Sequence, residues 1–257
     1  MIQLIKYEII KKYKSLLILL SVFGLMSLYT LYLFVDGEVE GALIGFSIYL
    51  LLGGVLVIYL LVNNILLFSS DLRRKTGYMV FLTPNNGYKI LGSKVLATVI
   101  ENAVFIILYA LIGLFFTVTF LNIVEEPLGA LGISQYIQID YTVNDFLTIL
   151  FICMTIALGW LNFMLTITLA ITLFKSLLAH VRYGGLISFG FFLVINYLVN
   201  RVYSIAQGLY STNEFMFEDI LEGTWMYNMG YECLTYLIVG AGLFTATAYL
   251  MDKKINL

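Results

Sequence analysis

Six long apolar runs constrain the fold of this 257-residue chain more than any other feature. A helix needs about 17 to 25 apolar residues to cross the roughly 30 Å hydrocarbon core of a bilayer, and each run is long enough. We predict six spans, at residues 15–35, 43–68, 95–121, 146–174, 183–200 and 231–250. Short segments of alternating polarity, typical of a membrane β-barrel, are missing. The chain is 61% hydrophobic and 12% charged, so it contains more apolar residues than a soluble domain of this length needs for its core. The sequence therefore predicts an all-α integral membrane protein, with a transmembrane domain over residues 15–257.

Residues 1–14, ahead of the first span, have a different pattern. Apolar side chains recur there every three or four positions, at Ile2, Ile5, Ile9 and Tyr13. Polar side chains fill the positions between them: Lys6, Glu8, Lys11, Lys12 and Lys14. This pattern is typical of an amphipathic helix lying in the membrane interface; a basic tail ahead of the span is the alternative. The run at 15–35 is too long for a secretory signal, and no small-residue cleavage site follows it.

The distribution of positive charge predicts the orientation. Basic residues near span ends stay in the cytoplasm. If the N-terminus is cytoplasmic, six spans place all 14 Lys and Arg residues except Arg201 on that side. We therefore expect a multi-pass protein of a cell membrane with both termini cytoplasmic. The outer loops are acidic, and they form either a solvated surface or a rim that attracts cationic cargo.

Residues 71–94, between the second and third spans, form the largest predicted cytoplasmic feature, because segments 175–182 and 252–257 are short. A charged stretch and an apolar run are followed by Thr83-Pro84-Asn85-Asn86-Gly87, a composition that breaks a helix and reverses the chain. Thr83 is suited to cap a new helix with Pro84 at its first position. The pattern predicts a helix, a sharp turn and a short helix ending at Lys94.

This segment resembles the coupling helix of the permease subunit of type 2 ATP-binding-cassette exporters. The matching positions are Asp71, Thr76-Gly77, Tyr78–Leu82, Thr83-Pro84, Tyr88-Lys89-Ile90 and Leu91-Gly92-Ser93-Lys94. The six spans and the N-terminal amphipathic helix extend the resemblance along the chain. Asn85-Asn86-Gly87 is a departure, because a serine or arginine is common there in the family.

The resemblance implies the membrane-spanning permease half of a bacterial ABC exporter, in which the coupling helix sits in a groove on an ATPase and transmits its closure to the spans. It would move a hydrophobic or amphipathic substrate, such as a peptide, lipid or drug, outward by alternating access. The implied partners are two ABC ATPase subunits, which would bind ATP and Mg²⁺, and a second copy or a related permease. Membrane lipids are expected partners too, and nucleic acid is not. The coupling residues would be Asp71, Arg73, Arg74, Lys75, Gly77, Tyr78, Phe81, Leu82, Thr83, Pro84, Asn85, Asn86, Gly87, Tyr88, Lys89 and Lys94. The basic ones are also suited to contact anionic headgroups, and both roles are compatible.

The sequence does not predict an enzyme, nor a cofactor or metal bound by this chain. Residues 87–94 superficially resemble a phosphate-binding loop, but the order Gly92-Ser93-Lys94 differs from the Gly-Lys-Ser/Thr order that the motif requires. The single histidine, His180, falls in a short inner turn, and no cluster of metal ligands occurs. Cys153 and Cys233 are interpreted as free packing cysteines, and a disulfide between them is the alternative.

Glu101 is the acidic residue that lies well inside a predicted span. Ionisable groups there are costly and indicate function by default. Glu101 would line a cavity, pair with Lys94 or with a neighbouring subunit, or lie shallow enough to reach the inner headgroups. The asparagines of the spans, at positions 63, 64, 162, 196 and 200, are predicted to join helices by hydrogen bonds, and Gly240, Gly242 and Ala246 to form a small-residue face.

Two other classes of function are compatible with the spans. A channel or ion-coupled transporter without an ATPase partner would carry ionisable residues deep in several spans, and Glu101 is the residue that indicates this class. A membrane scaffold would not need the turn at Thr83-Pro84. The apolar spans do not identify the substrate, because a bilayer requires the same composition.

Overall fold

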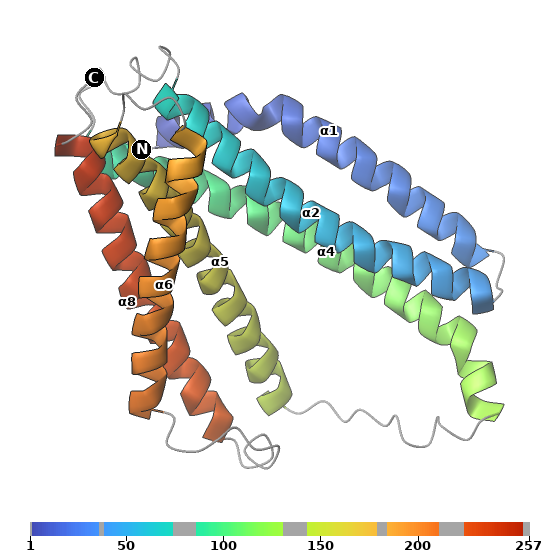
Figure 1. The fold of residues 1–257 in the computed structure, drawn as a ribbon. Helices are drawn as coiled ribbons and strands as arrows, with labels where there is room; N and C mark the ends of the chain where they lie inside the picture. Colours follow the sequence, from blue (N-terminus) through green and yellow to red (C-terminus); the bar gives the residue numbers. More distant parts are fainter. Residues whose placement is uncertain are drawn as a thin grey trace. The chain divides into compact units, whose positions relative to one another are not determined.

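The computed structural model describes residues 2–35, 39–73, 86–130, 143–178, 184–210 and 224–253, and each of these segments is built on one long helix (Figure 1). The helices are α1 (Ile2–Val35), α2 (Val39–Arg73), α4 (Gly87–Ala130), α5 (Val143–Leu177), α6 (Gly184–Tyr210) and α8 (Thr224–Lys253). Each contains a stretch that is long and apolar enough to cross a membrane. The described residues therefore confirm an all-α protein with six candidate spans.

Several helices are longer than the predicted spans. Residues 2–14 continue without a break into the first span, within α1. The short helix predicted to end at Lys94 is the beginning of α4, which has 44 residues and starts at Gly87. No proline follows Gly87 until Pro127, so nothing interrupts the backbone hydrogen bonds at Lys94. The connection expected at 201–230 is shorter than predicted, because α6 extends to Tyr210 and α8 begins at Thr224.

The chain forms two compact units, and the boundary between them falls within α2 and within α4. The first unit contains Met1–Asn64 and Ser93–Asp140. The second contains Ile65–Gly92 and Tyr141–Leu257. The described part of the candidate coupling segment before Ser93 therefore belongs to the second unit, and Lys94 and Glu101 belong to the first.

In the first unit α1, α2 and α4 lie side by side (Figure 1). The buried positions of α1 recur every 11 residues, as Glu8, Leu19 and Thr30, and again as Lys12, Phe23 and Phe34. Three turns of α-helix take about 11 residues, so both sets lie on one stripe. The apolar part of this stripe packs in two clusters, one of Leu19, Phe23, Leu56, Leu60 and Phe105, the other of Phe34, Ala42, Tyr49 and Phe116.

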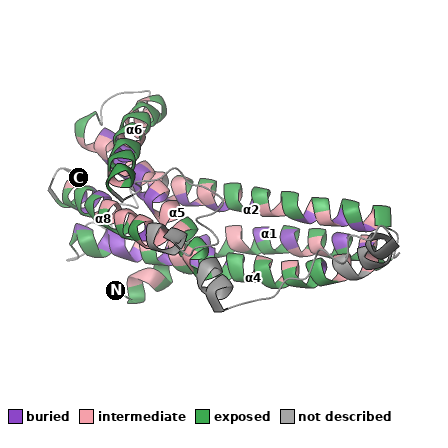
Figure 2. Cartoon of the chain, turned by 90° about the horizontal axis from the view of Figure 1, so that it is seen from below, coloured by how far each residue is buried: buried purple, intermediate pink, exposed green. Residues whose placement is uncertain are grey.

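Most of the remaining apolar side chains point outward. Only 11% to 22% of the most apolar window of each candidate span is buried within the chain. Figure 2 shows exposed residues along every described helix. Soluble proteins rarely leave such large apolar surfaces open to water, so this surface fits a lipid environment.

In the second unit α5 packs against α8 and α6. The Asn162 amide of α5 donates to the Tyr236 carbonyl oxygen of α8 at 2.9 Å, and a Cβ at Gly240 would lie 3.1 Å from the Asn162 amide oxygen. Asn162 thus joins two helices as predicted. The prediction that Gly240, Gly242 and Ala246 form one small-residue face is wrong, because Gly240 faces α5 whereas Gly242 and Ala246 are exposed.

Both cysteines are free. Cys233 is buried and its sulfur lies 3.3 Å from the Thr155 hydroxyl of α5. Cys153 is exposed. The interpretation of these residues as unpaired is therefore confirmed.

Candidate functional site

Two buried ion pairs join α1 to α4 in the first unit. Lys94 Nζ lies 2.7 Å from Glu8 Oε1, and Lys12 Nζ lies 2.6 Å from Glu101 Oε2. The Lys12 and Glu101 side chains are 6% and 2% exposed, so water hardly reaches the second pair. Along α1 the acidic Glu8 comes before the basic Lys12, whereas along α4 the basic Lys94 comes before the acidic Glu101. Each pair is therefore complementary, and the four charges sum to zero.

Amide and hydroxyl groups complete the Lys12–Glu101 pair. The Lys12 ammonium also donates to Asn64 Oδ1 and to the Thr98 hydroxyl, the latter at 3.5 Å. The Thr98 hydroxyl donates to Asn64 Oδ1 at 3.2 Å, and Asn63 Nδ2 donates to Glu101 Oε1 at 3.4 Å. An ammonium group has three donors, and Lys12 has a partner for each. The cluster thus links α1, α2 and α4 through charged and polar contacts.

Glu101 therefore pairs with Lys12, and the predicted pair with Lys94 is wrong. Lys94 and Glu101 are seven residues apart on α4, about 10 Å along the axis, which is too far for a direct contact. Helix α1 supplies a partner of opposite charge to each of them. Sequence reasoning placed Glu8 and Lys12 on a polar face toward the headgroups. Their spacing of four, which puts them on one helix face, was the available signal.

A pair of stacked tyrosines holds α2 against α4 further along the first unit. The rings of Tyr49 and Tyr109 lie 4.5 Å apart and within 7° of parallel. The Tyr109 hydroxyl donates to the backbone carbonyl oxygen of Tyr49 at 3.2 Å, and the Tyr49 hydroxyl donates to the backbone carbonyl oxygen of Tyr109. A Cβ at Gly53 would lie 2.5 Å from the Tyr109 oxygen, and one at Gly113 would lie 2.8 Å from the Tyr49 oxygen. The two glycines therefore make room for the two rings.

The tyrosine pair has a signal in the sequence that hydropathy alone does not reveal. Both helices carry tyrosine followed four residues later by glycine, as Tyr49 to Gly53 and Tyr109 to Gly113. Residues four apart share a helix face, so each helix offers one ring and one gap to its neighbour. The repeat of this motif in adjacent spans predicts the reciprocal contact.

In the second unit, the start of α4 is fixed to the end of α8. The Asn86 carbonyl oxygen accepts hydrogen bonds from Lys89 N and Ile90 N, at 2.8 Å and 3.2 Å, which identifies Asn86 as the N-cap. The Gly87 N–H donates to Asp252 Oδ1 at 3.0 Å. With its amide nitrogen turned toward α8, Asn86 donates to the same carboxylate at 2.8 Å and 3.0 Å. A carboxylate is stabilised at a helix N-terminus, where the macrodipole is positive.

Glycine is required at position 87 because the two helices approach closely. A Cβ there would lie 2.9 Å from the Ala248 carbonyl oxygen of α8. The next two residues of α4 are both exposed, and the Tyr88 ring lies 6.4 Å from that of Phe244. Lys89 is thus accessible to a partner.

The remaining coupling candidates are described only in part. Asp71 and Arg73 belong to the last turn of α2. Arg74, Lys75, Gly77, Tyr78, Phe81, Leu82, Thr83, Pro84 and Asn85 lie outside the described residues. Among the described candidates, Asn86 and Gly87 contact Asp252, Tyr88 lies near Phe244, and Lys94 forms the ion pair with Glu8.

Within the described segments, no three or more His, Cys, Asp or Glu residues gather in a way that would hold a metal ion. Comparisons with known protein families, with characterised proteins and with solved structures find no match to this chain. Two features of the residues bear on function: the two charge pairs between α1 and α4, and the long helix α4, whose first turn belongs to the predicted coupling segment.

Proposed function

We propose that the chain is the membrane-spanning permease half of an ATP-driven ABC exporter, working with a separate ATPase. The six apolar helices supply the spans that a permease needs. The resemblance of residues 71–94 to a coupling helix supports the ATP-driven class. In this proposal the chain lies in a bacterial cell membrane with both termini in the cytoplasm, because that orientation keeps all basic residues but Arg201 inside.

The observation that carries this proposal is the continuity of α4. The helix begins at Gly87, within the proposed coupling segment, and runs unbroken for 44 residues, about 66 Å along its axis. A force on its first turn would therefore be delivered along a whole span. The hydrogen bonds of Asn86 and Gly87 to Asp252 would carry the same force to α8.

The first turns of α1 fit an interfacial position in this proposal. Ile2 and Tyr13 are 83% and 61% exposed, and Ile9 is exposed too. Glu8 and Lys12, which face α4, are buried. Lys6, Lys11 and Lys14 are exposed as well, and an outer surface with both apolar and basic side chains suits contact with acyl chains and anionic headgroups.

The transport cycle follows from the family mechanism. Two permease halves, identical or related, would enclose a pathway for a hydrophobic or amphipathic substrate. Binding of ATP and Mg²⁺ would bring the two ATPases together, and the coupling segments would rock the halves to open the pathway outward. This chain would supply the lever and the pathway, and its partner the hydrolysis.

A photo-crosslinking residue at Lys89 tests the proposal, with Leu209 as the control. Leu209 is 81% exposed near the end of α6 that the proposal places outside the cell. We expect the Lys89 probe, and not the Leu209 probe, to capture a chain with its own phosphate loop in cells of the source organism. Changing Thr83-Pro84 or Leu82 should abolish co-purification of that ATPase. Retained co-purification, or capture of no ATPase, would overturn the proposal.

An ion-coupled transporter or channel is the second candidate, favoured by the buried charges of Lys12 and Glu101 inside candidate spans. Its test is transport by the purified chain in liposomes without any ATPase. Uptake driven by an ion gradient and abolished by Glu101→Gln would favour this candidate. Transport that requires the ATPase and ATP would favour the exporter.

A further inference from the structure

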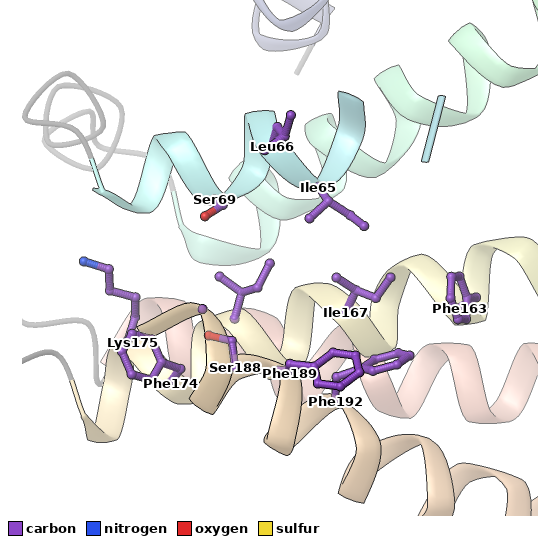
Figure 3. Close-up of a pocket in the computed structure, with 13 residues that line it drawn as sticks. Ile65, Leu66, Ser69, Phe163, Ile167, Phe174, Lys175, Ser188, Phe189 and Phe192 are labelled. Carbon is purple, nitrogen blue, oxygen red and sulfur yellow. The ribbon is translucent and has the colours of Figure 1, made fainter. Parts of the chain in front are cut away.

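The second unit contains an elongated cavity of about 400 Å³ between α5, α6 and the last turns of α2 (Figure 3). Cavities of about 300 to 1,000 Å³ are typical of small-molecule sites. Its walls are mostly apolar, formed chiefly by Ile65, Leu66, Phe163, Ile167, Phe189 and Phe192. A hydrated or strongly polar ligand would find few partners on these walls, so the occupant must be largely apolar.

The cavity follows the axis of α5. Its lining residues on this helix include Phe163, Ile167, Ala170 and Phe174, which recur every three or four positions and so share one face. From Phe163 to Lys175 the helix rises about 18 Å. Half of the roughly 30 Å hydrocarbon core, the depth of one lipid leaflet, is about 15 Å. The α5 residues that line the cavity therefore extend over about the depth of one lipid leaflet, which is the space that an extended acyl chain occupies.

The two ends of the cavity differ in polarity. Figure 3 shows Ser69 and Lys175 at one end and the rings of Phe189 and Phe192 toward the other, with the lysine ammonium directed away from these rings. Lys175 lies in the last turn of α5, at the end of its candidate span, which in a bilayer would lie at the level of the headgroups. Among the residues that the structure describes, Lys175 makes no ion pair. The polar end thus offers a positive charge at headgroup level.

We propose that this cavity binds one acyl chain of an anionic phospholipid, whose phosphate contacts Lys175. The apolar walls take the chain, and the charge at the span end selects an anionic headgroup over a zwitterionic one. The polar hydroxyls of Ser69 and Ser188 lie beside the same stretch of cavity. The proposal depends only on the chain being a membrane protein, and it stands whether or not the chain couples to an ATPase.

Binding can be measured on the purified full-length chain by native mass spectrometry in detergent. The probes are phosphatidylglycerol and phosphatidylcholine with the same acyl chains, and oleate. We expect the wild type to retain one phosphatidylglycerol in preference to the other two. Lys175→Gln should weaken retention about fivefold, the loss expected for one basic residue beside an anionic lipid. The control Lys14→Gln removes an exposed charge elsewhere and should leave retention unchanged.

A side chain that fills the cavity should prevent the lipid from binding there. Gly185 lines the cavity, and a Cβ there meets no atom within 4 Å, so Gly185→Leu places a side chain in open space. We expect this variant to lose the retained lipid while keeping the melting temperature of the wild type. Gly190→Leu is the matched control, because Gly190 also faces open space on α6 but does not line the cavity.

A second measurement on the unaltered chain does not depend on how these variants fold. Phosphatidylglycerol with a photoreactive group on its acyl chain should label peptides containing residues 163–175 and 185–192. Equal retention of the three probes, retention that survives Gly185→Leu, or labelling confined to other helices would overturn the proposal. So would a cross-link at position 185 to a second copy of the chain, since a protein surface would then cover the cavity.

Discussion

The two units of this protein hold their helices together in different ways. In the first unit, α1 and α4 share two buried ion pairs, and α2 and α4 share a reciprocal tyrosine contact. In the second unit, α5 and α8 meet through the Asn162 amide and small residues, and an apolar cavity lies beside α5. The α1–α4 interface of the first unit thus contains buried charges, whereas the α5–α8 interface of the second unit contains a neutral interhelical hydrogen bond and adjoins a cavity.

The two kinds of contact differ in how strongly they hold an interface in place. A buried charge costs several kcal/mol unless it is paired, so a charge pair holds its helices in one register. An interhelical hydrogen bond in a membrane is worth about 0.6 kcal/mol on average, and a helix held by such bonds is easier to displace. We therefore expect the first unit to move as a rigid bundle, and the contacts of α5, α6 and α8 to adjust during any conformational change.

The largest effect is expected from breaking the inner ion pair. Lys12→Met leaves the Glu101 carboxylate buried without its cation, which should lower the free energy of unfolding by about 3–5 kcal/mol. Chemical denaturation in detergent micelles measures this loss. Lys14→Met is the control, because Lys14 is exposed on the same helix. Adding Glu101→Leu to Lys12→Met should recover most of the loss, since the unpaired charge is then gone. A small effect of Lys12→Met would contradict the account of the first unit.

An intermediate effect is expected at the tyrosine contact. A methyl group at position 53 would meet the Tyr109 ring and oxygen, so Gly53→Ala should destabilise the protein by about 1–3 kcal/mol. The neighbouring Gly54 has no atom within 4 Å of a Cβ, so Gly54→Ala should be neutral or slightly stabilising. The difference in melting temperature between these two variants is the measurement. Equal melting temperatures would mean that the rings do not pack as described.

The smallest effect is expected in the second unit. Asn162→Ala removes the hydrogen bond to the Tyr236 carbonyl and should cost about 0.5–1.5 kcal/mol. Asn200→Ala, at an exposed position of α6, should change stability by less than about 0.5 kcal/mol. Denaturation under the same conditions as for Lys12→Met allows a direct comparison. If Asn162→Ala costs as much as Lys12→Met, the two units do not differ as proposed.

The sequence predicts the spans well because hydrophobicity over 20 residues is a local property. Each predicted span lies within, or at most one residue beyond, one helix of the structure. The ends were less predictable: the charged first turns of α1 and the start of α4 continue their spans, since helical hydrogen bonding persists through polar residues as well. Asn162 was correctly expected to join helices, because an amide in a span has few other partners.

The partners of the buried charges were not predictable in the same way. Tertiary packing decides which face of α1 meets α4. When α1 is considered alone, Glu8 and Lys12 are therefore expected on an exposed polar face. Glu101 was identified as an acidic residue inside a span, but its partner, Lys12, lies 89 positions away in the sequence. The reciprocal tyrosines were visible as a repeated motif only when two spans were compared. The coupling residues from Arg74 to Asn85 stay a prediction from resemblance.

Labelling from the two sides of the membrane shows on which side α4 begins. In a chain with Cys153→Ser and Cys233→Ala, a single cysteine at Lys89 or at Leu209 is exposed to a maleimide that cannot cross membranes. The account predicts that Lys89→Cys reacts only in inside-out vesicles and Leu209→Cys only in intact cells. Reaction of Lys89→Cys in intact cells would place the start of α4 outside the cytoplasm, where no ATPase can act on it, and would contradict the proposed function.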